Sequence, residues 1–345
     1  MTGGTAGQQA GREAPEYRFA RGAHPPSVVF AGAGMVSELH HRAIIVGGHL
    51  RLAGVFDPQV ELAQRRALDW GCRRYEDLEE ALCDPTVQAV LVLSAPGAHA
   101  EIALASLRAG KHVMIEKPVA SQDEIVGMGR EADERGLVCM PGHNYAYQPE
   151  FGSLRRLVKD GRLGRPRAAW LTYVVRHPES VARAYGSVLE EVMVHHTYLA
   201  LALFGVPTIV YAGCMEPAWE EHTAEDQAWM TWHYTGGLSV HHFATFAVDD
   251  HTSNPWLFAV KVLGDIGSSS YNWHDTIFQR PLGTLPFAVP AYEDSYVYEH
   301  AAFASAIAGD TGPVVSSLAD AAEAARLIVL AREANDTGAP VRVAL

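Results

Sequence analysis

The stretch SVVFAGAGMVS, residues 27–37, decides the fold. Its first five residues form a short apolar run that is typical of a buried strand, and a glycine turn follows at once. The turn has Gly32 and Gly34, with the small Ser37 where a third glycine often stands. This spacing lets the backbone approach a pyrophosphate, whose charge meets the N-terminus of the next helix. The stretch therefore predicts a strand, a phosphate-binding turn and a helix from about Met35.

An acidic residue, Asp57, stands twenty residues beyond Ser37, directly after the apolar run 50–56. A carboxylate at this position binds the hydroxyls of an adenosine ribose. It would also repel a 2′-phosphate, so NAD is favoured over NADP, although Arg65 and Arg66 lie further along. We expect the cofactor to contact Gly32, Gly34, Met35, Val36 and Asp57.

Strands and helices then alternate up to about residue 140. Apolar runs at 89–93, 112–115 and 137–140 are separated by helical segments, one of which starts with the capping box Ser121–Glu124. Such alternation predicts a doubly wound parallel sheet with right-handed crossovers. Residues 27–148 are therefore expected to form a Rossmann domain that binds NAD.

The pattern changes after Pro149. Segments 167–175, 228–234, 238–247 and 257–263 are rich in β-branched and aromatic residues, which indicates an open, mostly antiparallel sheet with one solvated face. A helix is predicted at 188–204, with Ser187 and Glu190 as a capping box, and another at 318–335. Residues 149–345 are thus expected to form an α+β domain for substrate binding and oligomerisation.

Composition narrows the functional classes. The chain of 345 residues has a formal net charge of −13, which disfavours binding to nucleic acid or to an anionic membrane surface. No apolar run is long enough to span a bilayer, and residues 1–26 read as a flexible tail without the apolar segment of a signal peptide. The four cysteines form no C-x-x-C pair, so we expect reduced thiols in a cytoplasmic protein.

Two further segments carry a family resemblance. SAPGAH (94–99) and AGKHVMIEKP (109–118) resemble the T-P-x-x-x-H, A-G-K-H-V and E-K-P patterns of the Gfo/Idh/MocA oxidoreductases. The resemblance adds Ser94, His99, Glu116 and Lys117 to the expected cofactor-binding residues. It implies that Lys117 binds the reacting oxygen of the substrate, that Glu116 lies near the nicotinamide ribose, and that the Lys117–Pro118 bond is cis. The position of residues 116–118, directly after the expected strand 112–115, agrees with these roles, because ligands of doubly wound sheets bind at the carboxyl ends of the strands.

The helix predicted at 188–204 would carry the proton-transfer group. Glu191 and His195 are four residues apart and share a face with Tyr198. The family pattern here is D-x-x-x-H, often with a second aspartate three residues further on. By resemblance His195 is the general base, and Lys117, His195 and Glu191 form the catalytic set. Glu191 and Tyr198 depart from the two family aspartates, which puts the identity of the substrate in doubt.

Three further residues are candidate substrate ligands: Asn144, Arg176 and His196. Asn144 lies in GHNYAYQP (142–149), which resembles the family's G-x-N-x-R-F-x-P loop with Ala146 in place of arginine, but a domain-joining turn explains it equally well. Arg176 ends a strand and faces either the pocket or the solvent. His196 points about 100° away from His195 and is structural or a pocket wall. No metal is expected, since the adjacent His241 and His242 point to opposite faces of a strand. The full set of expected substrate ligands is Lys117, Asn144, Arg176, Glu191, His195 and His196.

The sequence thus predicts an NAD-dependent oxidoreductase that transfers hydride to or from a sugar, a cyclitol or a related polyhydroxy or keto compound. Two alternatives stay open. One is a redox-neutral elimination or glycoside cleavage through transient oxidation of the sugar. The other is a non-catalytic protein that senses the cofactor or binds a partner. The family's open sheets often form oligomers, so a homodimer or homotetramer is expected.

Overall fold

The computed structural model describes residues 24–177, 179–182, 186–215, 217–218, 224–248, 256–273, 288–310 and 314–344. The expected tail, residues 1–26, therefore lies almost wholly outside the described residues. The first sheet has the strand order β3-β2-β1-β4-β5-β6, and its strands are all parallel. They are β1 (Ser27–Ala31), β2 (Arg51–Phe56), β3 (Arg73–Arg74), β4 (Ala89–Val92), β5 (His112–Ile115) and β6 (Cys139–Pro141).

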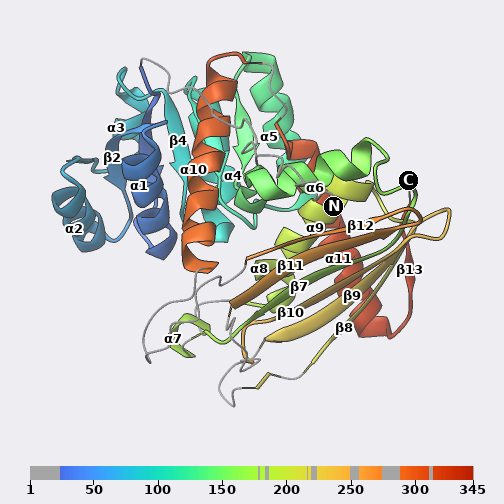
Figure 1. Cartoon of the computed structure of the whole chain (residues 1–345). Helices are drawn as coiled ribbons and strands as arrows, with labels where there is room; N and C mark the ends of the chain where they lie inside the picture. Colours follow the sequence, from blue (N-terminus) through green and yellow to red (C-terminus); the bar gives the residue numbers. More distant parts are fainter. Residues whose placement is uncertain are drawn as a thin grey trace, which may run out of the picture.

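Helices cover both faces of this sheet (Figure 1). They are α1 (Met35–Gly47), α2 (Val60–Trp70), α3 (Leu78–Cys83), α4 (His99–Arg108) and α5 (Gln122–Arg135). Strands β1 and β4 are buried along their whole length, which is why they read as unbroken apolar runs. The capping box of Ser121 and Glu124 forms at the start of α5 as expected. The doubly wound Rossmann fold is therefore confirmed.

The second sheet has the order β12-β11-β7-β10-β9-β8-β13. Strands β7 and β10 pair in parallel and the other described pairs are antiparallel, as the alternating segments predicted. Its strands are β7 (Pro166–Val175), β8 (Ile209–Cys214), β9 (Gln227–His233), β10 (Ser239–Thr245), β11 (Trp256–Gly264), β12 (Ser268–Asn272) and β13 (Val341–Arg342). Since β6 ends the first sheet and β7 begins the second, we keep a boundary near residue 148 as a proposal.

One further helical segment lies between β4 and α4 of the first domain, and five described segments lie between β6 and β8, three of which pack on the second sheet. They are η1 (Pro96–Ala98), η2 (Asn144–Tyr147), α6 (Pro149–Lys159), α7 (Glu179–Ala182), α8 (Val188–Glu191) and α9 (Met193–Phe204). The segment 188–204 was expected to be one helix, but Val192 interrupts it with φ −112° and ψ −47°. The expected capping box at Ser187 is also absent, because the Glu190 carboxylate binds Arg332 instead.

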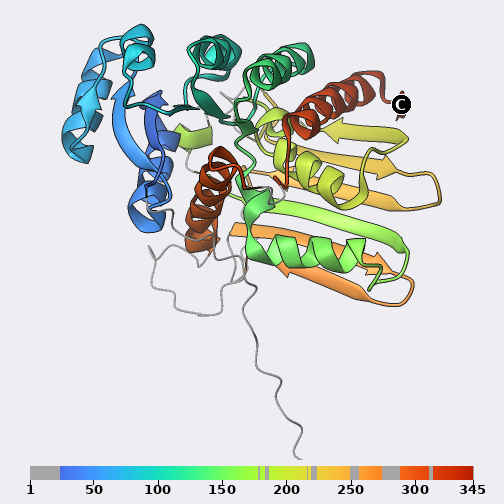
Figure 2. The same ribbon diagram turned by 90° about the horizontal axis from the view of Figure 1, so that it is seen from above.

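The last two helices return to the first domain. Helix α10 (Ala288–Ile307) packs on α1, and α11 (Leu318–Thr337) packs on α5 as well as on the second sheet. Figure 2 shows α10 beside α1, between the first domain and the second sheet. The sequence analysis missed α10, because its buried side includes Ser295, Glu299 and His300, so no continuous apolar stripe marks it.

Among the described residues, none of the helices combines the length and the apolar character that a bilayer span requires.

Candidate active site

The glycine turn after β1 forms a phosphate cradle. Gly32 has φ +124°, and a Cβ there would lie 2.4 Å from the carbonyl carbon and oxygen of Leu93, so only glycine fits. A Cβ on Gly34 would meet no atom within 4 Å, which leaves open space at the N-terminus of α1. Backbone access and a helix N-terminus suit a pyrophosphate, so Gly32, Gly34, Met35 and Val36 fit the expected dinucleotide.

Asp57 is fixed beside this cradle at the end of β2. Its Oδ2 accepts a hydrogen bond from the Ala33 amide at 2.8 Å, and its Oδ1 accepts one from the Gln59 amide at 2.8 Å. The nearby Arg66 is already engaged, because its guanidinium pairs with Glu38 and donates to the Ala33 carbonyl at 3.3 Å. The ribose end of the cradle thus presents a carboxylate and a neutralised arginine. This arrangement suits the free 2′-hydroxyl of NAD better than the 2′-phosphate of NADP.

Two of the expected cofactor ligands have other contacts. His99 is 1% exposed, and its Nδ1 lies 3.0 Å from the Pro118 carbonyl oxygen while its Nε2 lies 2.9 Å from that of Ser94. The imidazole therefore ties the end of β4 to the segment after β5, which makes His99 a positioning residue in this structure. The Ser94 hydroxyl donates to the Ala95 carbonyl at 3.3 Å.

Lys117 meets Glu191 across the two domains. The Lys117 ammonium lies 3.0 Å from Glu191 Oε2 and 3.2 Å from the Glu191 carbonyl oxygen. Both side chains are less than one-fifth exposed. The Lys117–Pro118 bond is cis, as expected from the resemblance. The extra methylene of Glu191 relative to aspartate therefore still lets the carboxylate hold the lysine.

His195 lies beside this pair on α9. Its ring stacks on Tyr145 with centroids 4.0 Å apart, and its Nδ1 lies 2.7 Å from the Tyr198 hydroxyl. Burial, followed by the positive charge of Lys117, lowers the pKa of His195 well below its usual range. The imidazole is therefore neutral at physiological pH and can accept a proton.

A cavity of about 330 Å³ joins these residues. Lys117, Glu191 and His195 all line it, so the structure brings the expected catalytic set together. Tyr145, Tyr173, His177, Trp256 and Tyr292 also line the cavity, together with aliphatic side chains and two glutamates. Helix α1 contributes Met35 to the same cavity, which connects it to the glycine turn.

Three expected substrate ligands do not line this cavity. Asn144 is 2% exposed and donates from Nδ2 to the Ser295 hydroxyl at 2.8 Å. His196 is fully buried and stacks on His242 under the second sheet, and neither of its ring nitrogens has a hydrogen-bond partner in the described part of the chain. Arg176 is exposed, whereas the next residue, His177, lines the cavity. Successive side chains point to opposite sides of an extended segment, so the side chain of His177 faces the cavity and that of the expected Arg176 does not.

Glu116 is held by residues that the sequence analysis missed. His40 Nε2 lies 3.0 Å from Glu116 Oε1, and His40 Nδ1 lies 2.8 Å from His300 Nε2. Burial alone would raise the pKa of Glu116, but the hydrogen bond and charge of His40, together with Lys117, lower it. The carboxylate thus stays ionised beside the lysine. Its Oε2 also accepts from the Lys117 amide at 2.8 Å, which fixes the turn that carries the lysine.

Comparison with known proteins agrees with this geometry. Residues 27–143 match a family model described as an oxidoreductase family with an NAD-binding Rossmann fold, and residues 151–269 match a GFO/IDH/MocA C-terminal domain. An uncharacterized oxidoreductase, YrbE of Bacillus subtilis, is 25% identical over 90% of this chain and 95% of its own length. The NAD-dependent scyllo-inositol 2-dehydrogenase of the same organism is 21% identical over 93% of this chain and 97% of its own length.

Solved structures show the same fold. The structure of scyllo-inositol dehydrogenase from Lactobacillus casei, with bound NAD(H) and scyllo-inositol, has a TM-score of 0.78. It covers 92% of this chain and 99% of its own chain at 16% sequence identity.

The contact between His40 and Glu116 leads to a prediction on stability. His40→Ala leaves the Glu116 charge buried without its partner and should cost about 3 kcal/mol at neutral pH. In the wild type, the lowered pKa of Glu116 contributes stability that is lost as the pH falls. In the variant burial raises that pKa, so acid relieves the buried charge. Urea unfolding should show the gap between the two proteins narrowing from about pH 7 to pH 4.

The matched control is His40→Gln, whose amide can still donate to the carboxylate. It should restore most of the lost stability. A gap that does not change with pH, or a glutamine variant as unstable as the alanine variant, would contradict this assignment.

Tyr198 generates a second prediction. Its oxygen faces both His195 Nδ1 and the Tyr145 amide, which lies 3.3 Å away. A base that acts through Nε2 needs its hydrogen on Nδ1, so we expect the Tyr198 oxygen to accept a hydrogen bond from Nδ1 and to stabilise this tautomer. Tyr198→Phe should therefore weaken this tautomer and lower turnover about tenfold, with little change in KM. Nitrogen-15 NMR of His195 checks the tautomer directly, and unaltered histidine shifts in the variant would refute the assigned role.

Proposed function

The chain belongs to the Gfo/Idh/MocA family of NAD-binding oxidoreductases, and from this premise we propose that it is a dehydrogenase or reductase of a cyclitol, a sugar or a related polyhydroxy compound. The convergence of Lys117, Glu191 and His195 on one cavity carries the proposal. Relatives named as inositol dehydrogenases support the substrate class. So does the wall of the cavity, because aromatic faces beside polar groups suit a ring that carries hydroxyls.

The residues divide the reaction between them. In the direction of oxidation, the Lys117 ammonium donates a hydrogen bond to the reacting hydroxyl and stabilises the negative charge that develops on its oxygen. His195 Nε2 accepts the hydroxyl proton. Glu191 holds the ammonium at 3.0 Å and keeps it from turning away. NAD bound at the glycine turn supplies the hydride acceptor, so an alcohol becomes a carbonyl with release of one proton. In reduction, protonated His195 returns the proton to the oxygen.

The second sheet supports an oligomer. Strand β7 turns Trp170 outward, where it is 39% exposed and stacks on His241 of β10 with centroids 5.6 Å apart. A flat face with exposed aromatic groups is typical of a subunit interface. We therefore propose a homodimer or homotetramer joined through this face. A cytoplasmic location fits the four free cysteines.

The oligomer has its own test. Trp170→Glu places a charge in the middle of the proposed interface and should shift the protein towards monomers in sedimentation equilibrium. Arg167→Glu, at an exposed position near the end of the same strand, is the control and should leave the assembly unchanged. A wild-type protein that is monomeric at every concentration would exclude the interface.

The activity is tested with NAD⁺ and a panel of inositols and sugars, by following the absorbance of the reduced cofactor. Lys117→Ala should lower turnover about 10²–10³-fold, because it removes the group that stabilises the oxygen. Calorimetry should show that NAD binding persists in this variant, since the glycine turn is intact. Lys117→Arg keeps the charge and should retain more activity than the alanine variant.

Two results would contradict the proposed dehydrogenase activity and indicate another function. Cofactor that co-purifies with the protein and cycles without net reduction would indicate redox-neutral elimination or glycoside cleavage. NAD binding with no turnover of any compound in the panel, in either direction, would indicate a non-catalytic cofactor sensor.

A further inference from the structure

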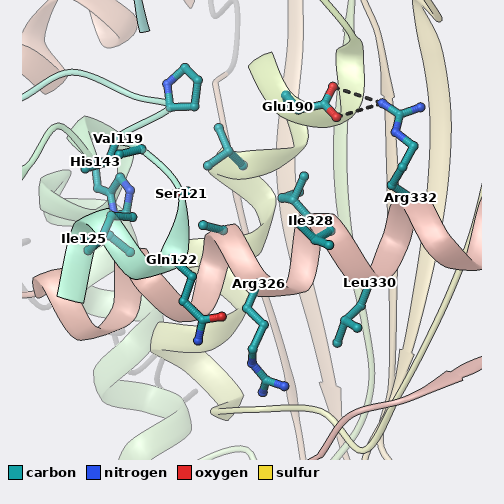
Figure 3. Close-up of a pocket in the computed structure, with 16 residues that line it drawn as sticks. Val119, Ser121, Gln122, Ile125, His143, Glu190, Arg326, Ile328, Leu330 and Arg332 are labelled. Carbon is teal, nitrogen blue, oxygen red and sulfur yellow. Dashed lines mark hydrogen bonds and ion pairs between the residues drawn. The ribbon is translucent and has the colours of Figure 1, made fainter. Parts of the chain in front are cut away.

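A second cavity lies behind the candidate active site. It measures about 390 Å³ and is bounded by the segment after Lys117, by α5, and by α8, α9 and α11 (Figure 3). Val119 and Ile125 line it from the first domain, and Val194 and Ile328 line it from the second. Its size falls within the range of small-molecule sites, and it spans the junction of the two domains.

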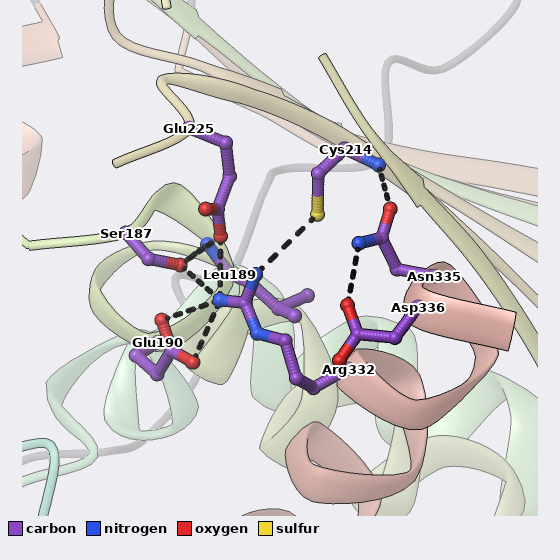
Figure 4. A network of polar contacts seen from close by, with 8 residues as sticks. All are labelled: Ser187, Leu189, Glu190, Cys214, Glu225, Arg332, Asn335 and Asp336. Carbon is purple, nitrogen blue, oxygen red and sulfur yellow. Dashed lines mark hydrogen bonds and ion pairs between the residues drawn. The ribbon is translucent and has the colours of Figure 1, made fainter. Parts of the chain in front are cut away.

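The charged groups around this cavity are already paired. Arg332 lies 2.8 Å from Glu190 Oε1 and 2.6 Å from Glu225 Oε1, and it donates to the Ser187 hydroxyl at 2.8 Å (Figure 4). Arg326 Nε donates to Glu323 Oε2 at 3.0 Å. A charged ligand would have to break one of these pairs, so the lining favours an uncharged molecule.

One buried polar group in the lining has hydrogen-bonding capacity left. The His143 ring is 1% exposed and lines the cavity, and its Nδ1 lies 2.6 Å from the Ser316 hydroxyl. Its Nε2 has no hydrogen-bond partner among the described residues. Burial lowers the pKa of His143 to about 3, so the ring is neutral. A neutral imidazole nitrogen can make one hydrogen bond to a ligand with a polar group.

The wall of this cavity is also the rear wall of the active site. The second cavity is lined by Pro118, Glu190 and Val194. Each of these residues is next in the chain to one residue of the catalytic set, Lys117, Glu191 or His195. In addition, the His143 ring stacks on Tyr198 at a centroid distance of 4.0 Å, and the Tyr198 hydroxyl contacts His195. A molecule in the second cavity would therefore touch the supports of Lys117, Glu191 and His195 without entering the active site.

We propose that the second cavity is an effector site for a small, uncharged, mainly apolar molecule with one hydrogen-bonding group. Because the site bridges the two domains, its occupant binds some domain arrangements better than others and so changes turnover. The effect on turnover rests on the proposed dehydrogenase function, whereas the binding itself does not.

Indole is a suitable probe, since it is uncharged and apolar and has one N–H group. Calorimetric titration of the full chain should detect its binding, and indene, which lacks the N–H group, should bind about 3- to 10-fold more weakly. Ala325→Phe places a ring in the cavity and should abolish indole binding. Ala319→Phe, at an exposed position of the same helix outside the lining, is the matched control and should bind like the wild type.

A second variant tests the site even if Ala325→Phe fails to fold. Val329 lines the cavity with 66% of its surface exposed, so Val329→Trp should fold normally and still weaken indole binding. Equal binding by the wild type and both filled variants, or no binding by the wild type, overturns the site.

Turnover is then measured with and without indole at saturating NAD⁺. A change in kcat of the wild type that disappears in Ala325→Phe supports the effector role, and an unchanged kcat overturns it. The titration needs no turnover, so failure of the proposed activity would be seen separately from failure of the site.

Discussion

The ion pair between Lys117 and Glu191 is the contact on which the rest of the site depends. Lys117 follows the last residues of β5 in the first domain, and Glu191 ends α8 in the second, so the pair forms only when the two domains meet. A lysine alone in this partly buried position would lose much of its hydration, and the carboxylate compensates for that loss. Burial, followed by the positive charge of Lys117, lowers the pKa of His195 and keeps its imidazole neutral. One interaction thus positions the polarising group and prepares the base.

Buried polar contacts hold this pair in place from behind. Glu116, His40 and His300 form a chain of hydrogen bonds that runs from β5 through α1 to α10. His40 Nε2 faces the carboxylate and its Nδ1 faces His300 Nε2, so the ring joins Glu116 to α10. Burial lowers the pKa of His300 well below its usual value, so its ring is neutral, and its Nδ1 has no hydrogen-bond partner among the described residues. A buried network of this kind is sensitive to single substitutions, because removing one member leaves another polar group without a hydrogen bond.

The last two helices join the two domains through direct contacts. Helix α10 brings His300 and Tyr292 to the first domain, and α11 packs on both α5 and β8. Each helix belongs to the second half of the chain but contacts elements of the first. Neighbouring residues of the same segments line the active-site cavity and the second cavity. Motion between the domains would therefore change both cavities at once.

The sequence alone determined the features that depend on local spacing. The glycine turn, the position of Asp57, the alternation of strands and helices and the placement of Lys117 at a strand end all follow from short patterns, because backbone geometry repeats over a few residues. Tertiary structure decided what depends on distant contacts. His40 and His300 are 260 residues apart in the chain, and no local period could pair them. Packing between layers likewise interrupts the helix at Val192 and buries His196. It also turns His177 and not Arg176 toward the cavity. At these positions the surroundings of a side chain come from distant parts of the chain.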